Sequence, residues 1–115
     1  MRLSTHVLDS TGGDPARGIL VRWERLAGVD WRPVAEAVTD HDGRVTDWVT
    51  ARGAAEPLAT GTHRLLFSTG DYFSGRGVET FYPEVVVVFA VTDTGRHHHV
   101  PLLLSPFAYS TYRGS

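Results

Sequence analysis

The sequence predicts a single all-β domain, a sandwich of about eight strands with one short helix. Apolar and polar residues alternate with a period of two in most apolar segments, which is typical of half-buried strands. Glycine stands beside Asp or Thr between these segments, as in hairpin turns. At 115 residues the chain has the length of one domain, residues 1–115, and it contains no cysteine that could form a disulfide.

The first expected strand covers residues 3–9. Its two faces are Leu3, Thr5 and Val7 on one side, and Ser4, His6 and Leu8 on the other. The second covers residues 19–26, where Ile19, Val21 and Trp23 form the inward face. These patterns place one face of each strand against a common core.

Three more strands and a helix are expected in the middle of the chain. The strands cover residues 31–38, 43–49 and 63–68, and the helix covers residues 71–77. Pro33 favours an edge strand or a bulge, because proline cannot donate a ladder hydrogen bond. Two glycines, Gly75 and Gly77, keep the helix short.

The C-terminal third supplies the remaining strands, over residues 84–91, 97–104 and 108–112. Residues 84–91 are apolar on both faces, so this strand needs a cover on each side. An apolar strand of this kind favours pairing between subunits, and we expect an oligomer.

Strand parity sorts the polar residues near the C-terminus. Val100, Leu102 and Leu104 form the better apolar face of residues 97–104, and His98 joins that face. The residues expected to point away from the core are His97, His99, Pro101 and Leu103, together with Ser110 and Tyr112 of the last strand. His6 is expected on the equivalent outward face of the first strand.

Composition excludes several classes of function. The net charge is −2 and the basic residues, all Arg, form no cluster, so a nucleic-acid partner is not expected. The sequence contains no apolar run long enough for a signal peptide or a membrane span. We therefore expect a cytoplasmic protein without a membrane partner.

The three consecutive histidines also permit a metal interpretation. Adjacent strand residues point to opposite faces, so only His97 and His99 could share an ion, with a third ligand such as His6. His41 is interpreted as a turn residue and His63 as a strand-start residue. The sequence has no GxSxG motif that would expose a nucleophilic serine.

Three segments together resemble the transthyretin-like 5-hydroxyisourate hydrolases of purine catabolism. They are LSTHVLDSTGGDPARG near the N-terminus, DGR in the middle, and HHVPLLLSPFAYSTYRGS at the C-terminus. The resemblance spans nearly the whole chain, and the closing YRGS is that family's signature. It implies an all-β, transthyretin-like (prealbumin-like) eight-stranded β-sandwich.

The resemblance also implies an assembly and a set of site residues. Relatives form homotetramers in which two dimers meet around a channel, with active sites at the dimer–dimer interface and no metal or organic cofactor. The implied catalytic residues are His6, Arg44, His99, Tyr112 and Ser115, of which His6, Arg44 and Tyr112 also bind substrate. Ser115 would bring the terminal carboxylate to the site. Two departures from relatives, His98 and Ala108, concern fine specificity and not the reaction.

These residue types suit hydrolytic ring opening of a small purine-derived substrate in urate degradation. Two histidines can act as general base and general acid, and either His6 or His99 can be the base. Arg44 can bind the oxo and nitrogen edge of the substrate and stabilise developing negative charge. The alternative is a transthyretin-like carrier of a small ligand without catalysis, in which the same channel would be lined by apolar residues.

Overall fold

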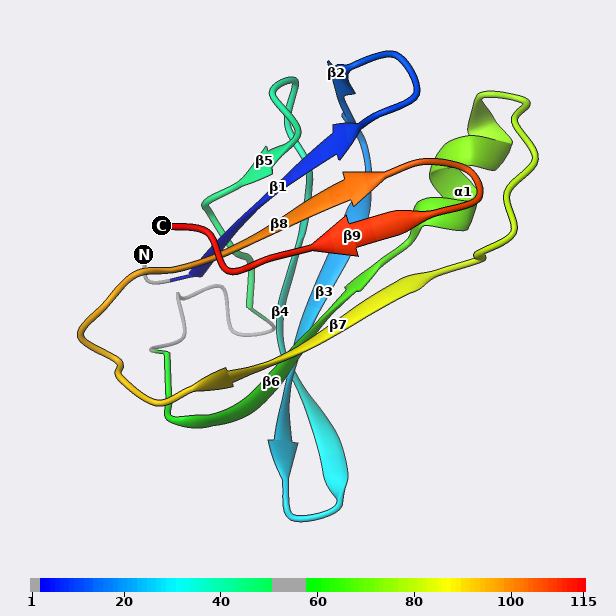
Figure 1. The fold of residues 1–115 in the computed structure, drawn as a ribbon. Coiled ribbons are helices and arrows are strands. Elements are labelled where there is room, and N and C mark those ends of the chain that lie inside the picture. Colours follow the sequence, from blue (N-terminus) through cyan, green and yellow to red (C-terminus); the bar gives the residue numbers. More distant parts are fainter. Residues whose placement is uncertain (1–2, 51–57) are drawn as a thin grey trace.

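The computed structural model describes residues 3–50 and 58–115, which form a two-layered β-sandwich with one short helix (Figure 1). The elements are β1 (Leu3–Asp9), β2 (Asp14–Pro15), β3 (Leu20–Ala27), β4 (Asp30–Val38), β5 (Arg44–Val45), β6 (Gly61–Phe67), α1 (Thr69–Gly75), β7 (Val85–Val91), β8 (His98–Leu104) and β9 (Tyr109–Thr111). The all-β expectation is confirmed. The expected domain of residues 1–115 includes residues 1–2 and 51–57, which lie outside the described residues.

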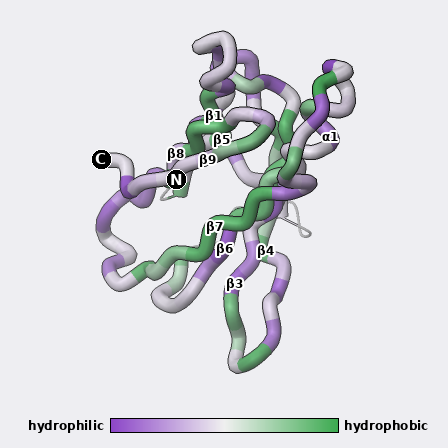
Figure 2. Tube along the Cα trace, turned by 45° about the vertical axis from the view of Figure 1, so that its right-hand side comes forward, coloured by the Kyte–Doolittle hydropathy of each residue, from purple (hydrophilic) through white to green (hydrophobic). Residues whose placement is uncertain are grey.

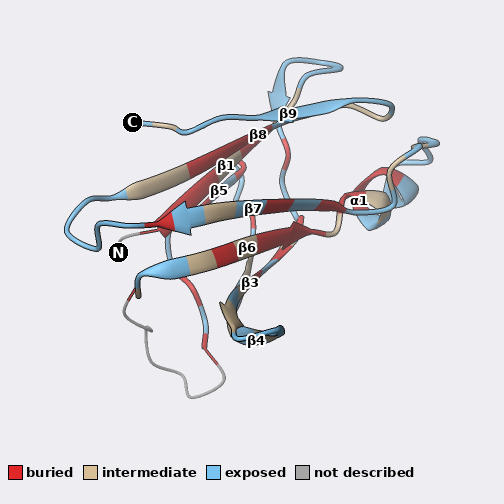
Figure 3. Cartoon of the chain, turned by 60° about the horizontal axis from the view of Figure 1, so that its bottom comes forward, coloured by how far each residue is buried: buried red, intermediate tan, exposed pale blue. Residues whose placement is uncertain are grey.

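Two sheets make the layers. The first, called here the β1/β8 sheet, has the order β2-β1-β8-β9, with β5 also paired to β1. The second, the β3/β6 sheet, has the order β4-β3-β6-β7. Figure 3 shows that both sheets contain buried residues and that α1 lies at one end of the sandwich. Within the first sheet β1 and β8 run parallel, whereas the neighbours of the second sheet are antiparallel.

The core lies between the sheets and is rich in large side chains. The largest fully buried ones include Trp23, Phe67 and Phe73. Trp48 packs edge-on against Trp23 with ring centroids 5.5 Å apart, and its Nε1–H donates to the Leu3 carbonyl at 2.9 Å. This hydrogen bond satisfies the indole while its ring remains in the core.

The expected strand over residues 43–49 is wrong in its length. Only Arg44–Val45 pairs with β1, and Val49 instead forms an isolated bridge with Glu36 of the other sheet. The chain therefore crosses from one layer to the other within this segment, and the regular pairing ends after Val45. Sequence analysis also missed β2, and it placed the helix two residues late, since α1 covers Thr69–Gly75.

The expectation that Pro33 lies in an edge strand or at a bulge is confirmed. β4 is an edge strand, and its register shifts opposite Trp23 and Glu24, next to Pro33. β7 lies at the other end of the β3/β6 sheet and is continuously apolar (Figure 2). Val88 on its outer face is 58% exposed, so the described residues do not cover the strand on both sides.

None of the helices in the described part of the chain has the length and apolar character that crossing a membrane requires.

Candidate active site

His6 and Arg44 come together on the outer face of the β1/β8 sheet. They are direct register partners in the antiparallel pair of β1 and β5. Directly opposed residues of such a pair have Cβ atoms about 4.5–5.5 Å apart and project to the same face. His6 is half-buried and Arg44 is exposed. The structure therefore brings together two of the residues that the family resemblance implies for the site.

The turn before Arg44 is held in place by its own hydrogen bonds. Asp40 Oδ1 accepts the backbone N–H groups of Asp42 at 2.8 Å and Arg44 at 3.0 Å. The Arg44 bond is the main cause that lowers the pKa of Asp40, because it favours the charged carboxylate. Gly43 has a φ of +73°, and a Cβ there would lie 2.4 Å from the Val7 carbonyl oxygen. The DGR sequence thus lets the turn lie tightly against β1 and directs Arg44 beside His6.

His99 lies on the same face, beside β1. It is the register partner of Ser4 in the parallel β1–β8 pair. The Ser4 Oγ atom lies 2.8 Å from His99 Nδ1 and 2.7 Å from His97 Nε2. Strand parity is confirmed here, since His97 and His99 contact the same hydroxyl whereas His98 contacts the Arg96 carbonyl instead.

The pKa of His99 is lowered from its ordinary value of 6.5. Burial is the largest cause, since it disfavours the charged imidazolium. Electrostatic interactions with His6, Arg44 and His97 lower it further, in that order. These interactions show that the three side chains act electrostatically on one imidazole, and they favour its neutral form near pH 7.

The C-terminal segment lies against His99. The Gly114 N–H donates to the His99 carbonyl at 3.0 Å. A Cβ on Gly114 would lie only 2.5 Å from Cδ2 of the His99 ring, so glycine is required for this close approach. Tyr112 is 58% exposed and Ser115 is exposed, on either side of this contact.

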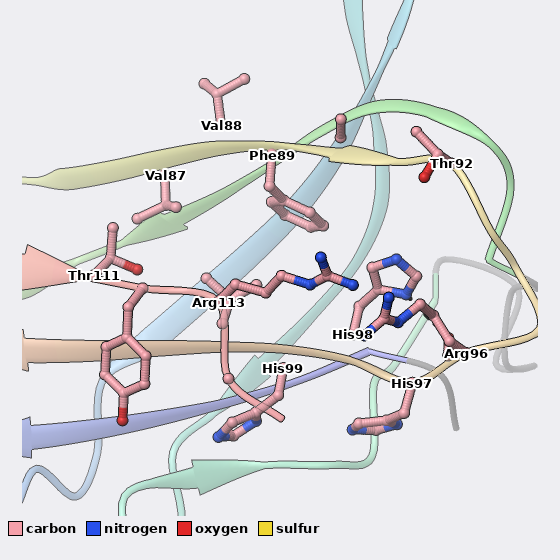
Figure 4. Close-up of a pocket in the computed structure, with 14 residues that line it drawn as sticks. Val87, Val88, Phe89, Thr92, Arg96, His97, His98, His99, Thr111 and Arg113 are labelled. Atoms are coloured by element: carbon pink, nitrogen blue, oxygen red, sulfur yellow. Dashed lines mark hydrogen bonds between the residues drawn. The ribbon is translucent and has the colours of Figure 1, made fainter.

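A cavity of about 330 Å³ adjoins the C-terminal segment, between β7 and β8. Figure 4 shows that Arg113 and His98 lie on the side of β8 that faces Phe89, whereas His97 and His99 project from its other side. His99, Tyr112 and Gly114 also contribute to the wall of this cavity. The segment 112–114 therefore lines this cavity and also contacts His99 of the outer face.

The other histidines have different surroundings. His41 is exposed in the turn, as expected. His63 is 1% exposed, receives a hydrogen bond from Trp23 Nε1–H at 3.0 Å, and lies with Nε2 2.7 Å from the Ala59 carbonyl. Its structural interpretation is confirmed, although it is a core residue and not merely the start of a strand.

The metal alternative receives no geometric support. Within residues 3–50 and 58–115, the one group of three possible ligands with mutually close atoms is Asp40, His41 and Asp42. The set His6, His97 and His99 is not such a group. The carboxylate of Asp40 already accepts backbone hydrogen bonds of the turn.

Sequence reasoning missed two contributors, Ser4 and Gly114. The alternation placed Ser4 on the same face as His6, but only the parallel pairing of β1 with β8 brings its hydroxyl between two imidazoles. Gly114 was part of the YRGS signature. Nothing in its spacing indicated contact with the His99 ring.

The fold and the outer face together define a class: a transthyretin-like β-sandwich that carries histidines and an arginine on the exposed face of one sheet. The family comparison agrees with this class. The chain belongs to the HIUase/Transthyretin family, whose model matches residues 3–114.

Named relatives and solved structures cover almost the whole chain. A probable 5-hydroxyisourate hydrolase of Caenorhabditis elegans is 45% identical over 98% of this chain and 81% of its own length. The 5-hydroxyisourate hydrolase of Mus musculus is 44% identical over 98% of this chain and 94% of its own.

Among solved structures, Klebsiella pneumoniae 5-hydroxyisourate hydrolase has a TM-score of 0.83 at 35% identity and covers 98% of each chain. Sea bream transthyretin in complex with thyroxine has a TM-score of 0.88 at 29% identity, over 99% of this chain and 95% of that one.

Proposed function

We propose that the protein is a 5-hydroxyisourate hydrolase, which opens the ring of 5-hydroxyisourate to 2-oxo-4-hydroxy-4-carboxy-5-ureidoimidazoline in urate degradation. The curated relatives of this name support the reaction, at 44–45% identity over nearly the full chain. The observation that carries the proposal is the grouping of His6, Arg44 and His99 on one exposed sheet face. These are groups for proton transfer and charge stabilisation.

Hydrolysis of a cyclic carbonyl needs a base and an acid. The oxygen of water bonds to the carbonyl carbon, the carbonyl carbon–nitrogen bond breaks, and a proton reaches the leaving nitrogen. A positioned general acid or base contributes about 10²- to 10⁴-fold in rate. His99 suits the role of base because its lowered pKa keeps it neutral near pH 7, and His6, on the neighbouring strand, is then the partner that exchanges protons with the substrate.

Arg44 stabilises negative charge on oxygen. Its guanidinium is always protonated and presents paired N–H donors in a planar fork. Because Arg44 is exposed and directly opposite His6, the fork is free to bind the oxo and nitrogen edge of a planar substrate. In the transition state the same donors would hold the developing oxyanion.

Tyr112 and Ser115 belong to the proposed site through the C-terminal segment. The Gly114–His99 contact brings this segment to the catalytic histidine. The exposed hydroxyls of Tyr112 and Ser115 would then donate hydrogen bonds to the substrate from the side opposite Arg44.

We also propose that the site is completed by assembly into a homotetramer. The outer face of the β1/β8 sheet is open, and beside the polar residues it presents two apolar ones, half-buried Leu8 and Leu103, which is 37% exposed. These two are register partners on β1 and β8. A second dimer packed on this face would bury them and exclude water from the adjoining histidines.

The carrier alternative rests on the likeness to transthyretin, since the fold itself does not discriminate between the two functions. The side chains do. A carrier of an apolar hormone is favoured by an apolar channel, whereas this face presents three imidazoles, a guanidinium and a buried serine hydroxyl. The residues therefore favour hydrolysis.

The test follows the ultraviolet absorbance of 5-hydroxyisourate, freshly prepared with urate oxidase, with and without the protein. We expect accelerated decay that survives extensive chelation, because no proposed catalytic group needs a metal. If the decay is not accelerated and the protein binds thyroxine tightly, the carrier function is supported in place of hydrolysis.

Light scattering of the wild type and of Leu103→Glu tests the assembly. We expect the wild type to be a tetramer. In Leu103→Glu the buried charge should dissociate the tetramer, and turnover should be lost.

A further inference from the structure

The Ser4 hydroxyl lies between two imidazoles. Its Oγ is 2.7 Å from His97 Nε2 and 2.8 Å from His99 Nδ1, both short hydrogen-bond distances. Ser4 is only 5% exposed, whereas His97 is exposed. The three side chains thus form a line from bulk solvent, through a buried hydroxyl, to the ring proposed as the base.

A serine hydroxyl has one proton to donate, and a neutral imidazole has one donor and one acceptor nitrogen. Two arrangements satisfy both contacts. In the first, His99 Nδ1–H donates to Ser4, and the Ser4 proton points to His97 Nε2. In the second, His97 Nε2–H donates to Ser4, and the Ser4 proton points to His99 Nδ1.

These arrangements differ in the nitrogen of His99 that remains for substrate. In the first, Nδ1 holds the proton, so Nε2 carries a lone pair and can accept a proton from water. In the second, Nδ1 accepts a hydrogen bond, so Nε2 of the neutral ring carries the proton and can donate it. The direction of the Ser4 hydroxyl therefore decides whether His99 is ready as a base or as an acid.

We propose that Ser4 and His97 are positioning residues that set the tautomer of His99 and connect it to solvent through a proton relay. The inference rests on the proposed function, since it deepens the role of a histidine in that site. Neither residue needs to touch the substrate. Ser4 is buried and contacts both rings, and His97 contacts it through Nε2.

The protons balance along this line. When His99 Nε2 takes a proton from the attacking water, its Nδ1 proton passes to Ser4 Oγ as the Ser4 proton passes to His97 Nε2. His97 is then charged, and it releases its Nδ1 proton to solvent. His99 is left neutral with the proton on Nε2. When Nε2 protonates the leaving nitrogen, the relay runs in reverse: Ser4 Oγ returns a proton to His99 Nδ1, His97 Nε2 returns one to Ser4, and His97 takes a proton from solvent. No bond other than those to protons changes in the relay.

The charges around His99 favour transfer away from it. His6 on β1, Arg44 on β5 and His97 before β8 all act on the ring, and each disfavours a lasting imidazolium. Arg113 of the C-terminal segment lies on the other side of β8 (Figure 4). Transfer of the proton through Ser4 to the exposed His97 removes the positive charge that the half-buried His99 would otherwise carry beside Arg44.

Steady-state kinetics of Ser4→Ala, Ser4→Thr and His97→Gln test the relay. We expect Ser4→Ala to lower kcat by about 10- to 100-fold with KM nearly unchanged, because the lost groups act in proton transfer and not in binding. Ser4→Thr, which keeps the hydroxyl, should recover most of this loss. His97→Gln keeps a hydrogen-bonding group but cannot carry a proton, so it should lower kcat and alter the pH profile. Ser10→Ala, at the end of β1, is the matched control for a serine removed from the same region.

Nitrogen-15 NMR of the histidine side chains gives a second readout that needs no turnover. We expect the Nδ1 and Nε2 signals of His99 to report a mixture of tautomers in the wild type and a changed mixture in Ser4→Ala. Wild-type kcat and unchanged signals in Ser4→Ala would overturn the proposal. So would a Ser4→Thr variant as slow as Ser4→Ala with an intact fold. If the wild type does not hydrolyse 5-hydroxyisourate, the proposed function fails, whereas the NMR comparison still decides whether Ser4 sets the tautomer.

Discussion

His63 and His99 lie in the two sheets of the same sandwich, and their surroundings invite comparison. Burial is the largest cause lowering the pKa of each. His63 lies in the core with its ring 5.9 Å from Trp23 and 5.8 Å from Phe89, centroid to centroid. Both of its nitrogens have partners inside the domain, Trp23 and Ala59. His99 shares Nδ1 with Ser4, and it lies on an outer face beside Arg44 and His6.

The difference shows that a lowered pKa does not by itself mark a functional histidine. A ring whose two nitrogens are held by core groups has no nitrogen for a substrate, whatever its pKa. A half-buried ring with one nitrogen fixed and a neighbouring guanidinium is arranged for chemistry. Geometry therefore separates scaffold from site where electrostatics does not.

The largest expected effect is loss of turnover on removing an outer-face imidazole. His99→Ala and His6→Ala should each lower kcat/KM by about 10²- to 10⁴-fold, because each removes a proton-transfer group. Their thermal midpoints should stay close to that of the wild type, since neither ring fills the core. The absorbance assay and circular dichroism together decide this, and a variant with full turnover would remove that histidine from the site.

The core histidine should show the reverse behaviour. His63→Ala leaves a cavity and an unpaired Trp23 N–H, so it should lower the free energy of unfolding by about 2–5 kcal/mol. Turnover per folded molecule should change little. Urea unfolding measured beside the assay provides the check. If the folded variant were as slow as His99→Ala, the distinction between scaffold and site would fail.

A smaller effect is expected where the C-terminal segment meets the site. In Gly114→Ala the new methyl group would clash with the His99 ring and push it from its position, so activity should fall by about 10-fold. Gly95→Ala in a surface turn is a matched control, because the atom nearest to its new Cβ is the end of the Asp93 side chain. Equal activities for the two variants would show that the His99 contact does not matter for turnover.

The smallest effect concerns pH and stability. Both histidines have folded-state pKa values below 6.5, so the unfolded chain binds more protons as pH falls through this range. The contribution of these two histidines to stability is therefore largest above pH 6.5 and decreases as the pH falls toward their folded-state pKa values. Urea unfolding between pH 8 and pH 5 should show this slope, and His99→Ala should reduce it. A slope that is unaffected by removing both histidines would assign the pH dependence to other groups.

Much of the site's composition could be read from the sequence. The alternation in residues 3–9 and 97–104 placed His6 and His99 on outward faces, because successive strand residues point to opposite sides. The family resemblance pointed to Arg44 and to the C-terminal Tyr112 and Ser115. Which strands are neighbours was not readable, because pairing joins segments more than 90 residues apart, as in Ser4 and His99.

The sequence by itself determined the β-rich class, the faces on which His6 and His97 to His99 lie, and a glycine-containing turn before Arg44, because these depend on local backbone geometry and a period of two. Only the tertiary structure decided that residues 43–49 cross between the sheets and that His63 is enclosed in the core. It also decided that the Ser4 hydroxyl lies between two imidazoles and that Gly114 contacts the His99 ring. The physical reason is that these contacts arise from the parallel pairing of β1 with β8 and from the packing of two layers, which join residues distant in the chain.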